Sequence, residues 1–510
     1  MVNKVYSNRI SEYTHENGGR VLLLFLLFCL ALYQFVSIGL PAFAIVCILP
    51  FLVLFIYAAF TWKMLTFWVL FFVNYFIQWH NISLPGPMSL YNEMLQIILL
   101  AIAIIDTRQK SHFERTANVM LFALIIWCSF CTLEVLNNTC DIGINVGAWF
   151  TGARMMAFQL LYIFLVFSIY ISSPEILRKY LIMWAFISLF SAIWTWKQVN
   201  IGLTPSEYSF LWGRGRSTHV IQAGTLIRYF STFSDAANYG CNAAATAVAF
   251  IIFGITTKIK KDKWLFLIIA ILVIKSMFSS GTRTAVFCLF VGFAFYIILS
   301  KSFKIAIPAA IVGSIAFIIL AFTNIGQGNQ QIRRMRSAFN KDDASTNTRT
   351  INQETMKKYM RDAPWGIGLG MGFDNVPTNN KFYKMATIPP DSEYVFIWLR
   401  TGRIGITIYI IITLIMFGGA CYVVLFRLKN KSLIGIGGGF CCAFVSIQLG
   451  GYGNQVLMQY PNCLLFYGGL TIVYILPYLE PTWIEYENKL YVEQEEKRRL
   501  KLEKKLAKRV

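Results

Sequence analysis

The sequence predicts an all-α polytopic membrane protein of about fourteen transmembrane helices, with the N- and C-termini inside. Of its 510 residues, 56% are hydrophobic and only 14% are charged, and the mean hydropathy is +0.56. Apolar stretches of about 20 residues, enough to cross a hydrocarbon core of roughly 30 Å, recur from Val21 to Leu479. Backbone polar groups in lipid must be satisfied within the segment, so these stretches are expected to be helices.

The predicted transmembrane domain covers residues 1–480. Its fourteen apolar segments run approximately over 21–39, 41–60, 64–79, 88–105, 117–135, 145–171, 176–199, 238–257, 264–280, 284–300, 304–323, 393–426, 432–450 and 463–480. The first segment follows Lys4, Arg9 and Arg20, as in a signal peptide. It is too long for a typical signal-peptide core, so an uncleaved first span is expected.

Positive charge alternates between the connections, which supports this number of spans. The connections assigned to the cytoplasm hold fifteen Lys and Arg residues. The opposite short connections hold four arginines and no lysine: Arg214, Arg216, Arg228 and Arg283. The positive-inside rule then places both termini in the cytoplasm. Topology also explains the net charge of +21, and no RNA- or DNA-binding motif accompanies it, so no nucleic-acid partner is expected.

Two extracytoplasmic connections are long, residues 200–237 and residues 324–392, and the second is expected to be partly helical. Connections of this length usually carry function. Residues 481–510 form a basic tail, expected to be a cytoplasmic helix. Its basic end either lies against anionic lipid or serves as a solvated topology anchor.

No cofactor and no protein-built metal site are expected. The four histidines are widely separated and lack ligand spacing, and most of the eleven cysteines lie in apolar spans. Cys128 and Cys131 have CxxC spacing, but no second pair or histidine accompanies them, so they are expected to pack in the core.

Arginine on the outer side suggests a phosphate ligand, because guanidinium pairs with phosphate through a planar fork of donors. Arg283 lies between two spans in the stretch 279–285, and Arg228 precedes another span. Arg349 lies in the longer connection, after Arg333, Arg334 and Arg336. For Arg228 or Arg283 alone, a snorkelling arginine at a helix end is the alternative.

The longer connection continues through a glycine run, residues 363–372, and ends in two carboxylates. The glycines either let backbone approach a ligand or form a plain turn cluster. Asp391 and Glu393 precede an apolar helix. Capping of the helix N-terminus and catalysis both account for carboxylates at this place.

Taken together, these stretches resemble the O-antigen ligase and polymerase superfamily of bacterial envelope glycosyltransferases. Residues 228–238, residues 280–285, and Arg349 followed by Pro364 to Gly368 are similar to three of its signatures, in the same order. The resemblance covers roughly residues 200–410.

The fourth signature is the most specific. Asp391-Ser392, nine residues, Gly402 and Gly405 keep the family's spacing, with aspartate in place of the family's histidine. That histidine helps to activate the acceptor in ligases, so the resemblance favours a polymerase over a ligase.

The resemblance implies lipopolysaccharide or exopolysaccharide synthesis in the bacterial cytoplasmic (inner) membrane, with an active site that faces the periplasm. The donor would be an undecaprenyl-diphosphate-linked glycan, and the acceptor a saccharide or lipid-linked glycan. Arg228, Arg283 and Arg349 would hold the diphosphate, and Arg283 would stabilise the departing charge. Asp391, with Glu393 as second choice, would be the general base of a metal-independent, inverting transfer.

A polysaccharide flippase or transporter that handles the same lipid-linked glycans is the main alternative. A purely structural membrane scaffold is a third alternative. Transporters usually show internal repeats and charged helices near the bilayer midplane. No repeat is visible here, and Glu93, Arg154 and Lys275 do not form paired halves. Lys275, near the outer end of its span, is not explained by the enzyme hypothesis.

Overall fold

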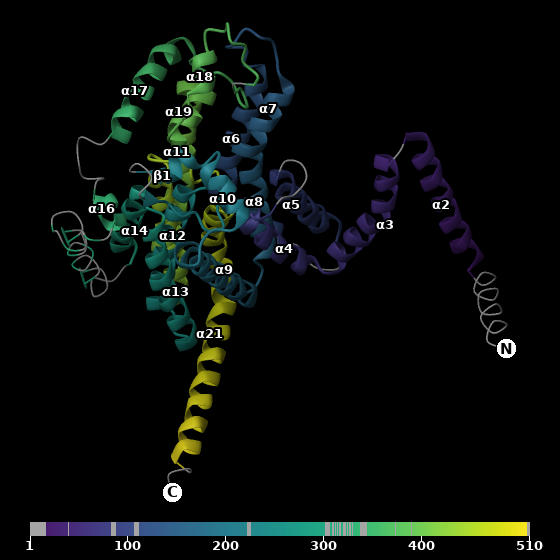
Figure 1. The fold of residues 1–510 in the computed structure, drawn as a ribbon. Helices are drawn as coiled ribbons and strands as arrows, with labels where there is room; N and C mark the ends of the chain where they lie inside the picture. The colour runs from purple at the N-terminus through teal and green to yellow at the C-terminus, as the bar shows by residue number, and fades with distance from the viewer. Residues whose placement is uncertain are drawn as a thin grey trace. The chain divides into compact units, whose positions relative to one another are not determined.

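The computed structural model describes residues 17–38, 40–82, 88–106, 112–221, 226–300, 330–336, 344–372, 374–388 and 390–506, with scattered positions between 307 and 328 (Figure 1). The chain forms two compact units, residues 1–67 and residues 68–510. The first unit contains α2 (Gly18–Ile38) and α3 (Leu40–Thr61), both strongly apolar. Helix α4 (Lys63–Phe76) begins in the first unit and ends in the second.

The second unit is built from long helices joined by short ones. Six of the described long helices are uninterrupted by other helical turns: α5 (Met88–Ile105), α9 (Pro174–Asn200), α12 (Ala236–Thr256), α13 (Lys260–Ser279), α14 (Arg283–Leu299) and α20 (Lys431–Gly450). The others continue through a π-helical or 3₁₀ turn: α6 (Val119–Leu133) into η2 (Glu134–Leu136), α7 (Val146–Ala153) through η3 (Arg154–Phe158) into α8 (Gln159–Tyr170), α19 (Glu393–Tyr422) into η6 (Val423–Arg427), and η7 (Cys463–Tyr467) into α21 (Gly468–Leu506). The short elements are η1 (Phe113–Thr116), α10 (Pro205–Trp212), α11 (Arg216–His219), β1 (Val220–Ile221), β2 (Leu226–Ile227), α16 (Gln330–Arg336), α17 (Ala344–Tyr359), η5 (Met360–Asp362) and α18 (Tyr383–Thr387).

The all-α, multi-pass membrane class is confirmed. Eight of the described helices are long and apolar enough to cross a membrane, or nine if the bent pair Val53–Thr61 and Lys63–Phe76 is one span. Helix α13 stands outside this number because it carries four lysines and Asp262, and α14 because it has only 17 residues. The predicted span 304–323 lies largely outside the described residues. The count of fourteen and the position of both termini in the cytoplasm remain predictions.

Helix α12 lies at the centre of the second unit, against α13, α14 and α20. Its small residues, such as Gly240 and the run Ala243 to Ala245, let neighbouring helices approach closely, and nearly all of α12 is buried. Trp184 of α9 fills the space beside it and stacks on Phe440 of α20, with ring centroids 5.7 Å apart. Trp184 also packs edge-on against Phe250 and Phe253, so it fixes the C-terminal half of α12, whereas the candidate site begins at the first turn of this helix.

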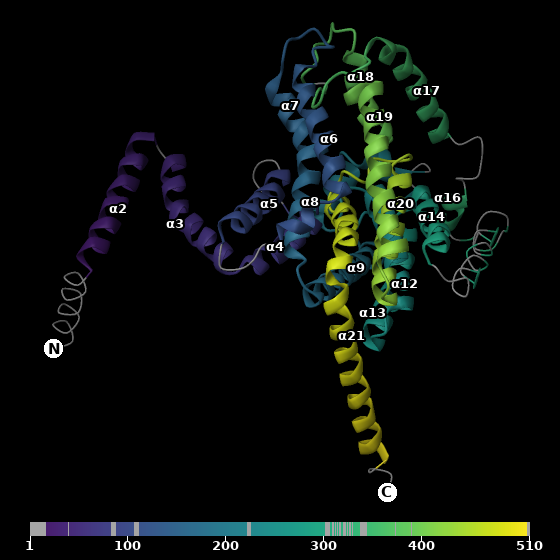
Figure 2. The same ribbon diagram turned by 180° about the vertical axis from the view of Figure 1, so that it is seen from behind.

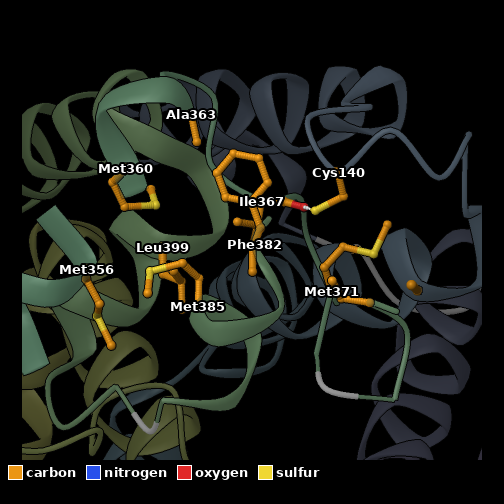
Figure 3. Packing of buried hydrophobic residues seen from close by; sticks show 11 residues of the cluster. Cys140, Met356, Met360, Ala363, Ile367, Met371, Phe382, Met385 and Leu399 are labelled. Carbon is orange, nitrogen blue, oxygen red and sulfur yellow. Dashed lines mark hydrogen bonds between the residues drawn. The ribbon is translucent and has the colours of Figure 1, made fainter. Parts of the chain in front are cut away.

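The described residues that precede α19 form a hydrophobic cluster of their own, which packs on the start of α19. Figure 3 shows Ile367 and Phe382 in the middle of this cluster, between Met360 on one side and Met371 on the other. The thiol of Cys140, from the connection between α6 and α7, donates to the carbonyl oxygen of Ile367 at 3.5 Å. The cluster therefore holds residues 356–385 against α19 and α7.

The C-terminal tail is not a separate helix but a continuation of the last apolar helix. Figure 2 shows α21 running on past the ends of α9 and α13 toward the C-terminus. Glu487 on α21 is buried and accepts hydrogen bonds from the side chains of Asn430 and Ser432 at the start of α20. A carboxylate beside a helix N-terminus is stabilised by the helix dipole, so the tail is anchored on α20.

Candidate active site

The turn between α13 and α14 is the centre of the site. Gly281 has a φ of +57°, which lets the chain reverse between Ser280 and Thr282. The Thr282 hydroxyl donates to the carbonyl oxygen of Ala236 at 2.8 Å. A Cβ on Gly240 would collide with Ser280, so the turn lies directly on the first turn of α12. Arg283, half-buried, is the first residue of α14 and follows this turn.

Two further guanidinium groups lie against the same turn. Arg228 donates through Nη2 to Thr282 Oγ1 at 2.9 Å and through Nε to the Ser280 carbonyl oxygen at 3.3 Å. Arg334, from α16, donates through Nε to the Gly281 carbonyl oxygen at 2.9 Å. Arg228, Arg283 and Arg334 therefore share one turn, and we call them the arginine cluster. The sequence hypothesis did not assign a site role to Arg334.

Arg349 lies in α17, and its side chain is outside the described residues. Its role as a third diphosphate ligand therefore rests on the resemblance alone.

His219, in the loop before Arg228, positions this arginine. The spacing of the four histidines did not predict a role for His219. The buried His219 ring accepts the Ala236 amide at Nε2, 3.1 Å away, and lies 3.0 Å from the Gly215 carbonyl oxygen at Nδ1. Burial, and then the nearby Arg228 charge, lower the pKa of His219 to about 4. The ring is therefore neutral at pH 7, with its proton on Nδ1. The Arg228 amide donates to the His219 carbonyl oxygen at 2.9 Å, which joins the two residues.

The connection between α20 and α21, residues 451–462, links the arginine cluster to α19, and we call it the bridging loop. On its α19 side, Glu393 is buried, and its Oε2 accepts the amides of Val456 and Leu457 at 3.0 and 3.1 Å. The Glu393 amide and the Ser392 hydroxyl both donate to the Gly451 carbonyl oxygen, at 2.8 and 3.1 Å. Glu393 therefore fastens this loop to the start of α19.

On its other side, the bridging loop contacts the first turns of α12 and α14. The Asn454 amide side chain donates to Thr284 Oγ1 at 2.8 Å, one residue after Arg283. The Asn462 side chain donates to Asn238 Oδ1 at 2.7 Å. One loop thus touches the N-terminal turns of α12, α14 and α19, and it connects the surroundings of Arg283 with those of Asp391.

Asp391 directly precedes the N-cap residue of α19, which is Ser392. Capping therefore does not account for Asp391. Its side chain is half-buried, and within the described part of the chain no hydrogen bond or ion pair engages its carboxylate. Glu393 differs, because its carboxylate is occupied by the loop amides.

The glycine run serves close packing of backbone against backbone. Gly366 has a φ of +82°, and a Cβ there would collide with the backbone of Arg400 and Gly402. Gly402 breaks the helical geometry of α19 with a φ of 67°, and a Cβ there would collide with Pro364. The amide of Gly368 donates to the Arg400 carbonyl oxygen at 3.1 Å. Two of the sequence signatures thus meet each other, and we call this contact the glycine clasp.

Two charged residues within the spans neutralise each other. Arg154 in η3 lies 3.3 Å from Glu93 in α5, measured from Nε to Oε1, and its Nη2 donates to Ser89 at 2.9 Å. Among the described residues, no group of three His, Cys, Asp or Glu side chains has an arrangement suited to a metal ion.

Comparison with known protein families adds one match. Residues 268–410 match the family model described as O-antigen ligase. No curated protein matches the chain. The matched region contains Arg283, Arg334, the glycine clasp and both carboxylates, whereas Arg228, His219 and the bridging loop lie outside it. The match confirms the resemblance of residues 268–410 to the O-antigen ligase and polymerase superfamily.

Proposed function

We propose that the protein transfers or polymerises glycan from an undecaprenyl-diphosphate-linked donor onto a saccharide acceptor, at the periplasmic face of the bacterial inner membrane. The match to the O-antigen ligase family model and the multi-pass helical architecture support an enzyme of the ligase/polymerase type. The observation that carries the proposal is the arginine cluster at the α13–α14 turn, joined by the bridging loop to the start of α19.

The arginine cluster would bind the donor diphosphate. Cleavage of the glycosyl bond places negative charge on the departing diphosphate, and fixed guanidinium groups stabilise that charge without reorganisation. The Thr282 hydroxyl donates to Ala236 and leaves the first amides of α14 without a side-chain cap, so the helix N-terminus adds to the attraction for an anion. Arg228 and Arg283 are the principal ligands, and Arg349 remains a third.

Asp391 would accept the proton of the acceptor hydroxyl. As the hydroxyl oxygen bonds to the anomeric carbon, the bond from this carbon to the diphosphate oxygen breaks and the proton passes to Asp391. A single displacement of this kind inverts the anomeric configuration. Glu393, the second candidate base, holds the bridging loop, and we assign it a positioning role.

We favour polymerisation over ligation, because aspartate stands where ligases of the family have histidine. The test uses purified full-length protein in liposomes with a lipid-linked oligosaccharide. We expect a ladder of longer glycans without added lipid A core. Arg283→Ala and Asp391→Ala should abolish the ladder while membrane insertion is unchanged.

Three results would change this proposal. Product that forms only when lipid A core is added indicates a ligase. Translocation of the donor without new glycosidic bonds indicates a transporter. Full product from both alanine variants rejects the assigned roles.

A further inference from the structure

A groove opens between α9 and α13, on the exposed surface of these helices. It encloses about 370 Å³ and is mainly apolar. Ile193 and Trp196 of α9 and Leu272 of α13 line it and are exposed in the protein. Exposed apolar side chains on membrane-spanning helices face lipid chains, and tryptophan is enriched where the chains meet the headgroups. We call this feature the α9–α13 groove.

Lys275 lies in the wall of the groove, on α13, and its side chain is exposed. It stands four residues before Ser279, or about 6 Å along the helix at 1.5 Å per residue. A lysine facing lipid is unfavourable unless its ammonium group reaches an anionic partner or water. Within the part of the chain that the structure describes, no carboxylate pairs with Lys275. The ammonium group therefore finds its partner outside the described protein, in water or in an anion such as a lipid phosphate.

The upper end of the groove leads to the arginine cluster. Ser279 lines the groove, and its carbonyl oxygen accepts the Tyr229 amide at 3.2 Å. The next carbonyl oxygen, that of Ser280, accepts Arg228 Nε at 3.3 Å. A lipid chain in the groove would therefore place its anionic end between Lys275 and Arg228.

We propose that the α9–α13 groove binds the polyprenyl chain of the lipid carrier, with Lys275 beside the phosphate that joins this chain to the glycan. The inference rests on the proposed function, because it assigns the lipid part of the donor to a place next to the diphosphate site. The chain stays among lipids while the glycosyl end reaches the arginine cluster, so the donor reacts without leaving the membrane. Lys275 then recognises the carrier phosphate and takes no part in bond cleavage.

The experiment uses photo-crosslinking in the full-length protein, reconstituted in liposomes. A benzophenone amino acid replaces Ile193 in the groove, or Ile271, which is exposed on α13 but does not line the groove. The probe is radiolabelled undecaprenyl phosphate. We expect labelling at position 193 to exceed labelling at position 271, and unlabelled undecaprenyl phosphate, but not phosphatidylglycerol, to compete. Lys275→Met should lower the labelling about tenfold, and Lys275→Arg should retain it.

Equal labelling at both positions, or competition by phosphatidylglycerol, overturns the inference, because the groove would then hold bulk lipid. Val199→Trp, which fills the groove without changing Lys275, provides a second variant and should also reduce labelling. Absence of labelling at position 193 in a protein with an intact groove and normal glycan synthesis rejects the groove alone. Specific labelling in a protein that makes no glycosidic bond retains the groove and rejects the transferase.

Discussion

Replacing Glu393 by alanine is expected to loosen the bridging loop at Val456 and Leu457, while the bonds from the Glu393 amide and the Ser392 hydroxyl to Gly451 remain. The Glu393 side chain is 3% exposed, and its Oε2 accepts two backbone amides, those of Val456 and Leu457. Alanine leaves both buried amides without an acceptor, and each unsatisfied buried amide costs about 1–3 kcal/mol. The expected decrease in the free energy of unfolding is therefore about 2–6 kcal/mol.

Glu393→Gln separates this positioning role from proton transfer. Glutamine keeps the size of the side chain and one acceptor oxygen for the amides, so we expect a loss of only about 1 kcal/mol in the free energy of unfolding. Glutamine cannot act as a general base. A positioning residue should therefore retain transfer activity within about tenfold in this variant, because the loop stays in place.

Asp391→Asn is the matched variant, since Asp391 lies two residues away and engages no partner within the described chain. We expect unchanged stability and no transfer. The assay measures denaturant unfolding in detergent, proteolysis within residues 451–462 and transfer from a lipid-linked oligosaccharide in the same preparations. Complete loss of transfer in Glu393→Gln, at unchanged stability, would refute the positioning role and make Glu393 the base.

Three further predictions concern the glycine clasp, the arginine cluster and the loop before α12. Gly402→Ala should decrease the free energy of unfolding by about 3–5 kcal/mol, because it combines a disfavoured φ with a backbone collision, whereas Gly418→Ala on the same helix, with open space around it, should not. Denaturant unfolding of both variants measures this. Arg228→Lys should lower transfer at least about 100-fold, because ammonium cannot reproduce the fork, while Arg216→Ala, at an exposed arginine, should retain transfer. Because the pKa of His219 is about 4 in the folded protein against an ordinary 6.5, stability is full above pH 6.5 and falls by about 3 kcal/mol as the pH decreases to 4. Unfolding across this range should lose that dependence in His219→Gln, and an unchanged dependence would refute the assignment.

Hydropathy locates the helices well, because each helix in lipid must close its own hydrogen bonds. The predicted segments 238–257 and 432–450 correspond to α12 (Ala236–Thr256) and α20 (Lys431–Gly450). The short elements of residues 200–237 were not predicted, because no apolar period marks them. Local side-chain hydrogen bonds determine where these short helices begin. Thr204 and Glu207 form a capping box, and Pro205 is the first residue of α10.

The site was less accessible to sequence reasoning, because its contacts join distant segments. Residue type and position at a span end single out Arg228 and Arg283, whereas Arg334 stands among other loop arginines with nothing to distinguish it. The bridging loop is a polar connection of ordinary length. Its importance comes from contacts with Thr284 and Glu393, which lie 170 and 63 residues from their partners.

The glycine clasp gives a physical reason for the spacing between Asp391 and Gly402. Gly402 is fixed against Pro364 and Gly366, and the helical residues from Glu393 to Thr401 extend from this fixed point to Asp391. Nine residues of helix place Asp391 about 14 Å from Gly402 along the axis of α19. Each added or deleted residue would turn Asp391 by about 100° around this axis. Only a fixed number of residues keeps Glu393 on the bridging loop and Asp391 beside it. The spacing from Asp391 to Gly402 therefore fixes a length and a rotation, and the glycines hold this register independently of the side chain at position 391.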